Sequence, residues 1–116
     1  MICYWSADDA LSEYEIKKMN LLLPDLIKLP LNIIFISKDS ESAWTSAISK
    51  RNYGGSHYRI TDSVETKLLS IVGANGEEQV LSTPDFFLYD AESKKLETQL
   101  PFPNSGRYFV EYVRGK

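Results

Sequence analysis

The sequence MICYWSADDALSEYE, residues 1–15, combines the features that decide the fold. The run from Ile2 to Trp5 is short, apolar and aromatic, which is typical of a buried strand. Asp8 and Asp9 follow it and favour the start of a helix, because their carboxylates can cap free backbone N–H groups at the positive end of the helix dipole. The stretch therefore predicts a strand that leads directly into a helix.

Outward from this stretch, the sequence predicts a βαβ unit. The helix is expected to run towards Leu23, and Pro24 should end or kink it because proline lacks the amide donor and clashes with the preceding turn. Residues 32–37 are nearly all β-branched or aromatic, which is typical of a parallel strand covered on both faces. Strand, helix and strand predict a right-handed crossover.

The rest of the chain predicts three more helices and a hairpin, between residues 86–89 and 96–100. The residues expected to start the helices are Asp39 or Ser40, then Thr61, Asp62 or Ser63, then Asn104 or Ser105. The second helix is expected to bury Trp44, Ala47 and Ile48. The third helix is expected to bury Val64, Leu68 and Ile71 or Val72. The second helix should stop before Gly54-Gly55. This order predicts an α/β fold, a three-layer α/β/α sandwich around a mixed four-stranded sheet with a C-terminal antiparallel hairpin.

The first fifteen residues resemble the opening of TlpA-like thiol-disulfide oxidoreductases, which belong to the thioredoxin-like superfamily. That family has an apolar strand, then W-A-x-W-C-x-x-C-R-x-E, then a long amphipathic helix. Aligning Trp5 with the first tryptophan and Glu15 with the glutamate places Asp9 and Ser12 at the two cysteine positions without a gap. Two further matches are residues 81–90, which resemble the x-x-T-P-x-x-F-L-x-D segment, and residues 35–39 followed by Trp44.

The resemblance implies a scaffold that keeps its binding surface and lacks its redox chemistry. A carboxylate and an unactivated hydroxyl cannot form or break a mixed disulfide, so no catalytic residue is expected. In the family the proline of the Thr-Pro segment follows a cis peptide bond, and the residue before it offers backbone groups to an extended peptide. By resemblance, the candidate binding residues are Trp5, Asp9, Ser12, Thr83 and Pro84. The sequence thus predicts a redox-inactive binding or docking module for a protein or peptide partner.

Other functions are consistent with the same residues. Asp8, Asp9 and Ser12 can act simply as helix caps. The family itself implies a redoxin relative in cell redox homeostasis, working with cysteines of a partner protein or with Cys3. Asp8 and Asp9 could bind a hard cation together with Asp85 or Asp90, although no calcium-loop signature supports this. His57, beside Tyr58, lacks an identifiable nucleophile to serve as general base, and a surface or loop position is expected for it.

Composition excludes several classes of function. The formal net charge is −3, and the basic residues are scattered, which argues against nucleic-acid binding. Cys3 is the single cysteine and His57 the single histidine, so a zinc site built from several such ligands is excluded and no metal or cofactor is expected. Because Cys3 lies in an apolar run, we expect a buried core thiol.

The length of 116 residues fits one thioredoxin-like domain spanning residues 1–116. No run approaches the roughly 20 apolar residues of a membrane span. We expect a domain excised from a longer protein of the periplasm or cell envelope, an expectation that rests on the family resemblance. Residues 76–81 look like an extension of the family's link to its Thr-Pro segment, and the sequence gives them no function.

Overall fold

The computed structural model describes residues 1–51, 55–72, 83–90, 92–98 and 100–115, without the side chains of residues 51, 68, 69, 71 and 72. Strands and helices alternate along most of the chain, which makes it an α/β protein. The elements are β1 (Ile2–Trp5), α1 (Ala10–Leu26), β2 (Ile34–Ser37), α2 (Glu41–Arg51), β3 (Ser56–Arg59), α3 (Asp62–Val72), β4 (Asp85–Asp90), β5 (Lys95–Glu97), the 3₁₀ turn η2 (Pro103–Ser105) and α4 (Arg107–Arg114).

The sheet is mixed and has the strand order β3-β2-β1-β4-β5. Strand β1 is central, parallel to β2 and antiparallel to β4; β3 is parallel to β2, and β5 is antiparallel to β4. The sheet therefore has five strands and not the four expected. The additional strand, β3, has the sequence Ser-His-Tyr-Arg, which is mostly exposed and polar and carries no apolar strand signal. Its pairing with β2 defines it.

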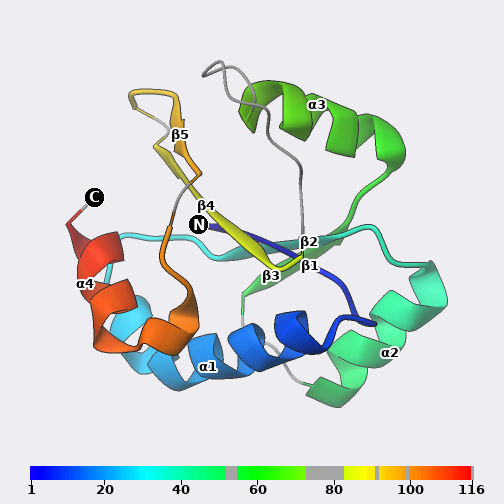
Figure 1. Ribbon diagram of the computed structural model, residues 1–116, viewed down its shortest axis with the longest axis horizontal. Coiled ribbons are helices and arrows are strands. Elements are labelled where there is room, and N and C mark those ends of the chain that lie inside the picture. Colours follow the sequence, from blue (N-terminus) through cyan, green and yellow to red (C-terminus); the bar gives the residue numbers. More distant parts are fainter. Residues whose placement is uncertain (52–54, 73–82, 91, 99, 116) are drawn as a thin grey trace.

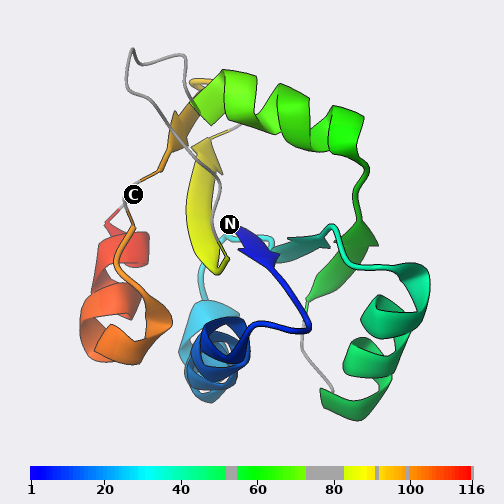
Figure 2. The ribbon, with the colours of Figure 1, turned by 45° about the vertical axis from the view of Figure 1, so that its right-hand side comes forward.

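Helices lie on both faces of the sheet. Figures 1 and 2 show α3 on one face and α1, α2 and α4 on the other. Successive side chains of β1 point to opposite faces, so Cys3 and Trp5 join the core under α1, whereas Tyr4 lies on the α3 side. The core under α1 also contains Ile16, Met19, Leu26, Phe35, Ala47, Phe86, Phe109, Val110 and Val113.

The chain enters β3 through a position that only glycine fits. Gly55 has a φ of +92°, and a Cβ atom there would lie 2.9 Å from the carbonyl oxygen of Ile33 and 3.0 Å from the ring of Phe35. A side chain would meet both a left-handed backbone and a fixed carbonyl. Gly55 thus allows β3 to lie directly beside β2.

Two helix boundaries differ from those expected. Helix α1 runs through Pro24 to Leu26, and the amide of Ile27 still donates to the carbonyl of Leu23 at 2.9 Å. Because Pro24 lies in the last turn and is exposed, its missing donor does not prevent one more turn. Helix α4 is capped by Gly106, without a side-chain cap, and not by Asn104 or Ser105, which lie in η2.

The start of α3 agrees with the sequence, and its packing is only partly described. Thr61 caps the helix through a 3.4 Å hydrogen bond from the amide of Val64 to its hydroxyl. Val64 was expected to be buried, but it lies in the first turn of α3 and is 44% exposed. The side chains of Leu68, Ile71 and Val72, and the extension at residues 76–81, lie outside the described residues. Among the helices described, none has the length and apolar character needed to cross a bilayer.

Candidate functional site

The first turn of α1 is built around Asp9. Asp9 has an extended backbone and is the N-cap residue, and one carboxylate oxygen accepts a 3.2 Å hydrogen bond from the amide of Leu11. The other oxygen accepts a 2.8 Å hydrogen bond from the Ser12 hydroxyl. The capping role expected for Asp9 is therefore confirmed, and the side chains at the two aligned cysteine positions touch each other.

The Ser12 hydroxyl is fully engaged. It donates to Asp9 and accepts a 3.2 Å hydrogen bond from the amide of Ser6, and the residue is completely buried. A hydroxyl that donates its proton to a carboxylate and is closed to solvent has no path to an incoming electrophile. Ser12 fixes the loop between β1 and α1 and is not placed as a nucleophile.

A second carboxylate, that of Asp39, binds the same loop between β1 and α1. It accepts hydrogen bonds from the Ser6 hydroxyl at 2.9 Å, the Ala7 amide at 2.7 Å and the Ser37 hydroxyl at 2.6 Å. The sequence analysis did not identify this cluster as part of the site. The available signal was its position: Ser6 and Asp39 follow the carboxyl ends of two strands that lie side by side in parallel, and such ends meet at one edge of a sheet.

Thr83 and Pro84 lie against this helix terminus. The peptide bond between them is cis, and the Thr83 side chain lies close enough to the Asp9 carboxylate to contribute to its lowered pKa. Partial burial of Asp9 acts to raise the pKa of its carboxyl. Hydrogen bonds from Ser12 and the amide of Leu11, together with the nearby Thr83 side chain, outweigh this and hold that pKa below its usual value. Asp9 is therefore a fixed anion at neutral pH.

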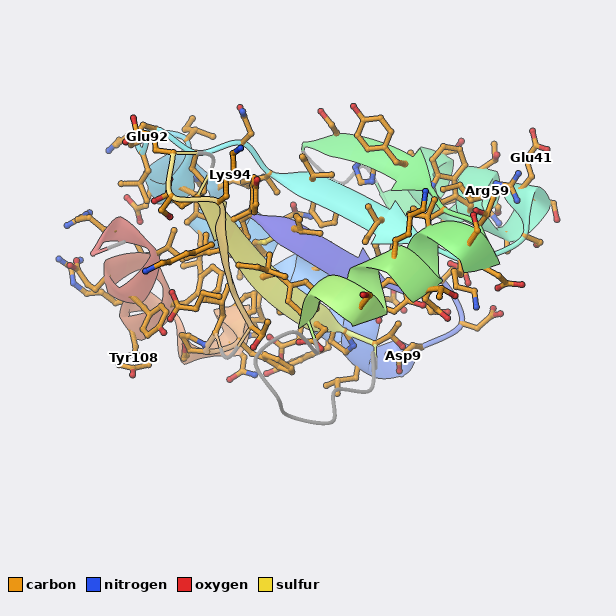
Figure 3. The ribbon with its side chains drawn as sticks, turned by 90° about the horizontal axis from the view of Figure 1, so that it is seen from above. Asp9, Glu41, Arg59, Glu92, Lys94 and Tyr108 are labelled. Carbon is orange, nitrogen blue, oxygen red and sulfur yellow. The ribbon has the colours of Figure 1, made fainter. Side chains whose placement is uncertain are left out.

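The five candidate binding residues differ in their exposure. Three of them are buried and therefore lie beneath the surface without lining it: Trp5, Ser12 and Pro84. Asp9 and Thr83 are half-buried and reach solvent. In Figure 3, Asp9 lies away from the β4–β5 turn, where Glu92 and Lys94 are labelled. The exposed part of the candidate site is thus the junction of the α1 N-terminus with the segment before β4.

Cys3 is fully buried on the central strand, as expected. Burial, together with the nearby charge of Asp85, raises the pKa of its thiol well above the usual value. Because the thiolate is the reactive species, Cys3 is a core residue in the folded chain and does not take part in the candidate site.

Glu15, aligned with the family's glutamate, is also completely buried. Its carboxylate accepts a 2.9 Å hydrogen bond from the backbone amide of Asn104 and a second one from the Asn104 side chain. These bonds tie α1 to η2. They also explain why Asn104 does not cap α4: its side chain is already used.

His57 is a strand residue and not the loop residue expected. It lies half-buried on β3, with its ring stacked on that of Phe35 at 4.6 Å between centroids and 9° between planes. It therefore packs on the sheet, away from the α1 terminus.

The proposed cation ligands do not gather at one place. Among the described residues, no group of three or more histidine, cysteine, aspartate or glutamate side chains could hold a metal ion. Asp90 is the last residue of β4, and its carboxylate accepts hydrogen bonds from two residues of the following turn, the Ser93 hydroxyl at 2.9 Å and the Glu92 amide at 3.0 Å.

Two hollows in the described part of the molecule lie away from the candidate binding residues and are not lined by them. A groove of about 880 Å³ lies at the far end, between residues 29–31, the β4–β5 hairpin and the end of α4. A hollow of about 210 Å³ lies beside Asp8 and α2.

No model of a known protein family matches this chain, and no curated protein matches it in sequence.

Proposed function

We propose that this chain is a redox-inactive, thioredoxin-like domain that binds an extended peptide at the surface formed by Asp9 and Thr83. The observation that carries the proposal is the closeness of these two side chains, which brings together segments far apart in the sequence. Both segments are those that resemble the TlpA-like family. Their meeting at the end of the central strand is what that family's arrangement requires, and helices on both faces of a mixed sheet agree with it.

The proposal is a binding function because the residues at this junction lack redox chemistry. Asp9 is a carboxylate, Ser12 is a saturated hydroxyl, and Cys3 is buried away from both. Thiol-disulfide exchange needs an exposed thiolate, which these three residues do not supply. Instead, the carboxylates of Asp9 and Asp39 fix the first turn of α1 and the loop that precedes it at Ser6.

The segment before β4 offers main-chain groups to a ligand. Within the described residues, the backbone N–H and carbonyl of Thr83 have no hydrogen-bond partner. An extended peptide could satisfy both groups, as in recognition by strand addition, and this mode requires no sulfur. The fixed anion at Asp9 lies beside this position and would favour a basic side chain in the ligand.

Binding can be tested with an array of cysteine-free heptapeptides and three proteins: the wild type, Thr83→Arg and the control Tyr58→Arg. Tyr58 is 56% exposed on β3, away from the α1 terminus, so the control adds the same charged group elsewhere. We expect Thr83→Arg to lose the peptides that the wild type binds and Tyr58→Arg to keep them. Shifts in ¹⁵N NMR spectra on peptide addition should cluster at Asp9 and Thr83. An array without binders, or shifts confined to other regions, contradicts the proposal.

The alignment beneath the proposal has its own test, the double variant Asp9→Cys/Ser12→Cys. The two side chains already touch at 2.8 Å, so cysteines there should form a reversible disulfide. The matched control is Asp8→Cys/Leu11→Cys, which has the same spacing shifted by one residue. We expect the first pair to oxidise at a more reducing glutathione ratio than the control pair. Failure of the first pair to oxidise would remove the family assignment, and insulin-disulfide reduction by the wild-type chain would remove the redox-inactive assignment.

A further inference from the structure

Helix α1 carries an exposed stripe on the side opposite its core. Leu11, Tyr14, Lys18 and Leu21, which we call the outer stripe, are three, four and three residues apart. At 100° per residue these positions fall within about 80° of one another around the helix. Leu11 and Tyr14 are each 48% exposed and Leu21 is 74% exposed, whereas Lys18 is half-buried. The opposite side of the helix holds the buried residues Ser12, Ile16, Met19 and Leu26.

The stripe has the pattern of a helix-pairing seam. Spacings of three and four are those of positions a and d in a heptad, which face a neighbouring helix. Single exposed apolar residues need no explanation, but large apolar side chains aligned along one helix mark an interaction surface. In Figure 2, α1 (blue) is seen end-on at the bottom of the molecule, between α4 (red) and α2 (blue-green).

The order of residues in the stripe specifies the partner. Leucine, tyrosine, lysine and leucine, at spacings of three, four and three, form a pattern that an antiparallel copy complements. We infer that α1 pairs antiparallel with α1 of a second copy of this chain. Leu11 then packs on Leu21 of the second copy, and Tyr14 faces Lys18 of the second copy, in both directions at once. This reciprocity is what a two-fold interface requires.

Electrostatics favours this orientation over the parallel one. The Lys18 ammonium lies 5.4 Å from the centre of the Tyr14 ring within one chain, so the ring already attracts a cation. The antiparallel pair presents each ring to a second ammonium group. A parallel two-fold pair would place Lys18 on Lys18, where like charges repel.

The dimer is expected to be weak. A helix of 17 residues is about 25 Å long, and one helix pair buries less surface than the roughly 1,200 Å² of a small stable complex. Association should therefore be measured over a concentration series of the purified chain up to about 1 mM, by sedimentation velocity. We expect the weight-average molar mass to rise with protein concentration, from the monomer mass towards twice that mass. A chain that stays monomeric throughout the series overturns the inference.

Charge variants test the register. Leu11→Glu and Leu21→Lys should each raise the dissociation constant at least about tenfold, because each puts charges on leucine. The combination Leu11→Glu/Leu21→Lys should restore association, since each glutamate then meets a lysine of the second copy. Ile27→Lys is the control, because Ile27 is 72% exposed and lies beyond the end of α1. Circular dichroism should show the wild-type helix content in all four variants.

Three outcomes would exclude the antiparallel pair. One is a loss of association with Ile27→Lys as large as that with Leu21→Lys. A second is the absence of rescue in the double variant. The third is association of the wild type only with an unrelated helical peptide. None of these outcomes depends on peptide binding at Thr83, so this inference is tested independently of the proposed function.

Discussion

The two faces of the sheet are covered by different means. On the side of α1, the helices bury a continuous apolar core that includes Trp5, Phe35 and Phe86. On the side of α3, the described core is smaller, centred on Tyr4 and Phe87. There α3 is attached through polar groups: the Tyr4 hydroxyl donates to Glu65 at 2.7 Å, and Lys38 pairs with Asp62 at 2.8 Å. Among the described residues, the contacts of α3 with the sheet are therefore more polar than those of α1.

Two adjacent phenylalanines on β4 test this difference most directly, because they point to opposite faces. Phe86→Ala removes a buried ring that makes edge contacts with Phe102 and Phe109 at 5.4 and 6.2 Å. We expect it to lower the free energy of unfolding by about 3–5 kcal/mol. Phe87→Ala, in the smaller cluster, should cost about 1 kcal/mol less, since fewer of the described apolar side chains surround that ring. Urea unfolding of both variants measures the difference, and equal losses would break the comparison.

Tyr4→Phe tests the polar attachment of α3. Removing the hydroxyl leaves Glu65 without this donor, and a hydrogen bond to a charged group contributes about 1.5–3 kcal/mol. The variant also has a pH signature. Burial, and then the hydrogen bond to Glu65, raise the pKa of Tyr4 to about 12 in the folded chain.

Because that pKa exceeds the unfolded value of about 10, the stabilisation is fully present below pH 10 and is lost as the pH rises towards 12. Thermal melts from pH 8 to pH 12 should therefore show wild type and Tyr4→Phe converging at the alkaline end. A constant difference across this range would show that the hydroxyl does not hold α3.

Lys38→Gln should have a smaller effect than Tyr4→Phe. Lys38 pairs with both Asp62 and Glu65 at the surface, and salt screens such pairs. We expect a slight fall in the melting temperature at low ionic strength, which disappears in 1 M sodium chloride. Lys17→Gln is a suitable control, because Lys17 pairs with Glu13 on the other side of the sheet. A loss that persists in high salt would indicate that the lysine stem, and not its charge, supports α3.

Asp85→Asn should also have a small effect, and its sign should be opposite. Burial raises the pKa of the Asp85 carboxyl, although the amide of Phe86 donates to it at 3.1 Å. A raised pKa means that the ionised form destabilises the folded state near neutral pH, and that this cost vanishes below the unfolded pKa near 3.9. The variant should melt a few degrees higher at pH 7 and at the wild-type temperature at pH 3. Destabilisation at pH 7 would contradict the assignment.

The parts of the fold that could be predicted depend on local signals. The strand Ile2–Trp5 is a continuous apolar run, and the helix after it begins at Asp9, a residue that caps itself onto the next turn. Such features are visible within a few residues of sequence, because the groups that interact are neighbours along the chain. The capping half of the candidate site was predictable for the same reason.

The parts that could not be predicted depend on contacts between distant segments. Strand β3 is mostly polar because it lies at the sheet edge, and only its pairing with β2 identifies it. The hydrogen bond from Ser6 to Asp39 spans 33 residues, and the one from Tyr4 to Glu65 spans 61. Serine, aspartate and tyrosine at those positions carry no local signal that would match them to one another. Tertiary structure alone brings these residues together.

Because Cys3 is buried, the reaction of its thiol with a reagent can be used to measure opening of the central strand. Cys3 is the single cysteine, it lies on the central strand β1, and none of its surface reaches solvent. A thiol reagent can modify it only in those molecules whose central strand has separated from its neighbours. The modification rate under native conditions therefore measures the free energy of that separation. Each variant described above that adds no cysteine can be compared with the wild type by this rate.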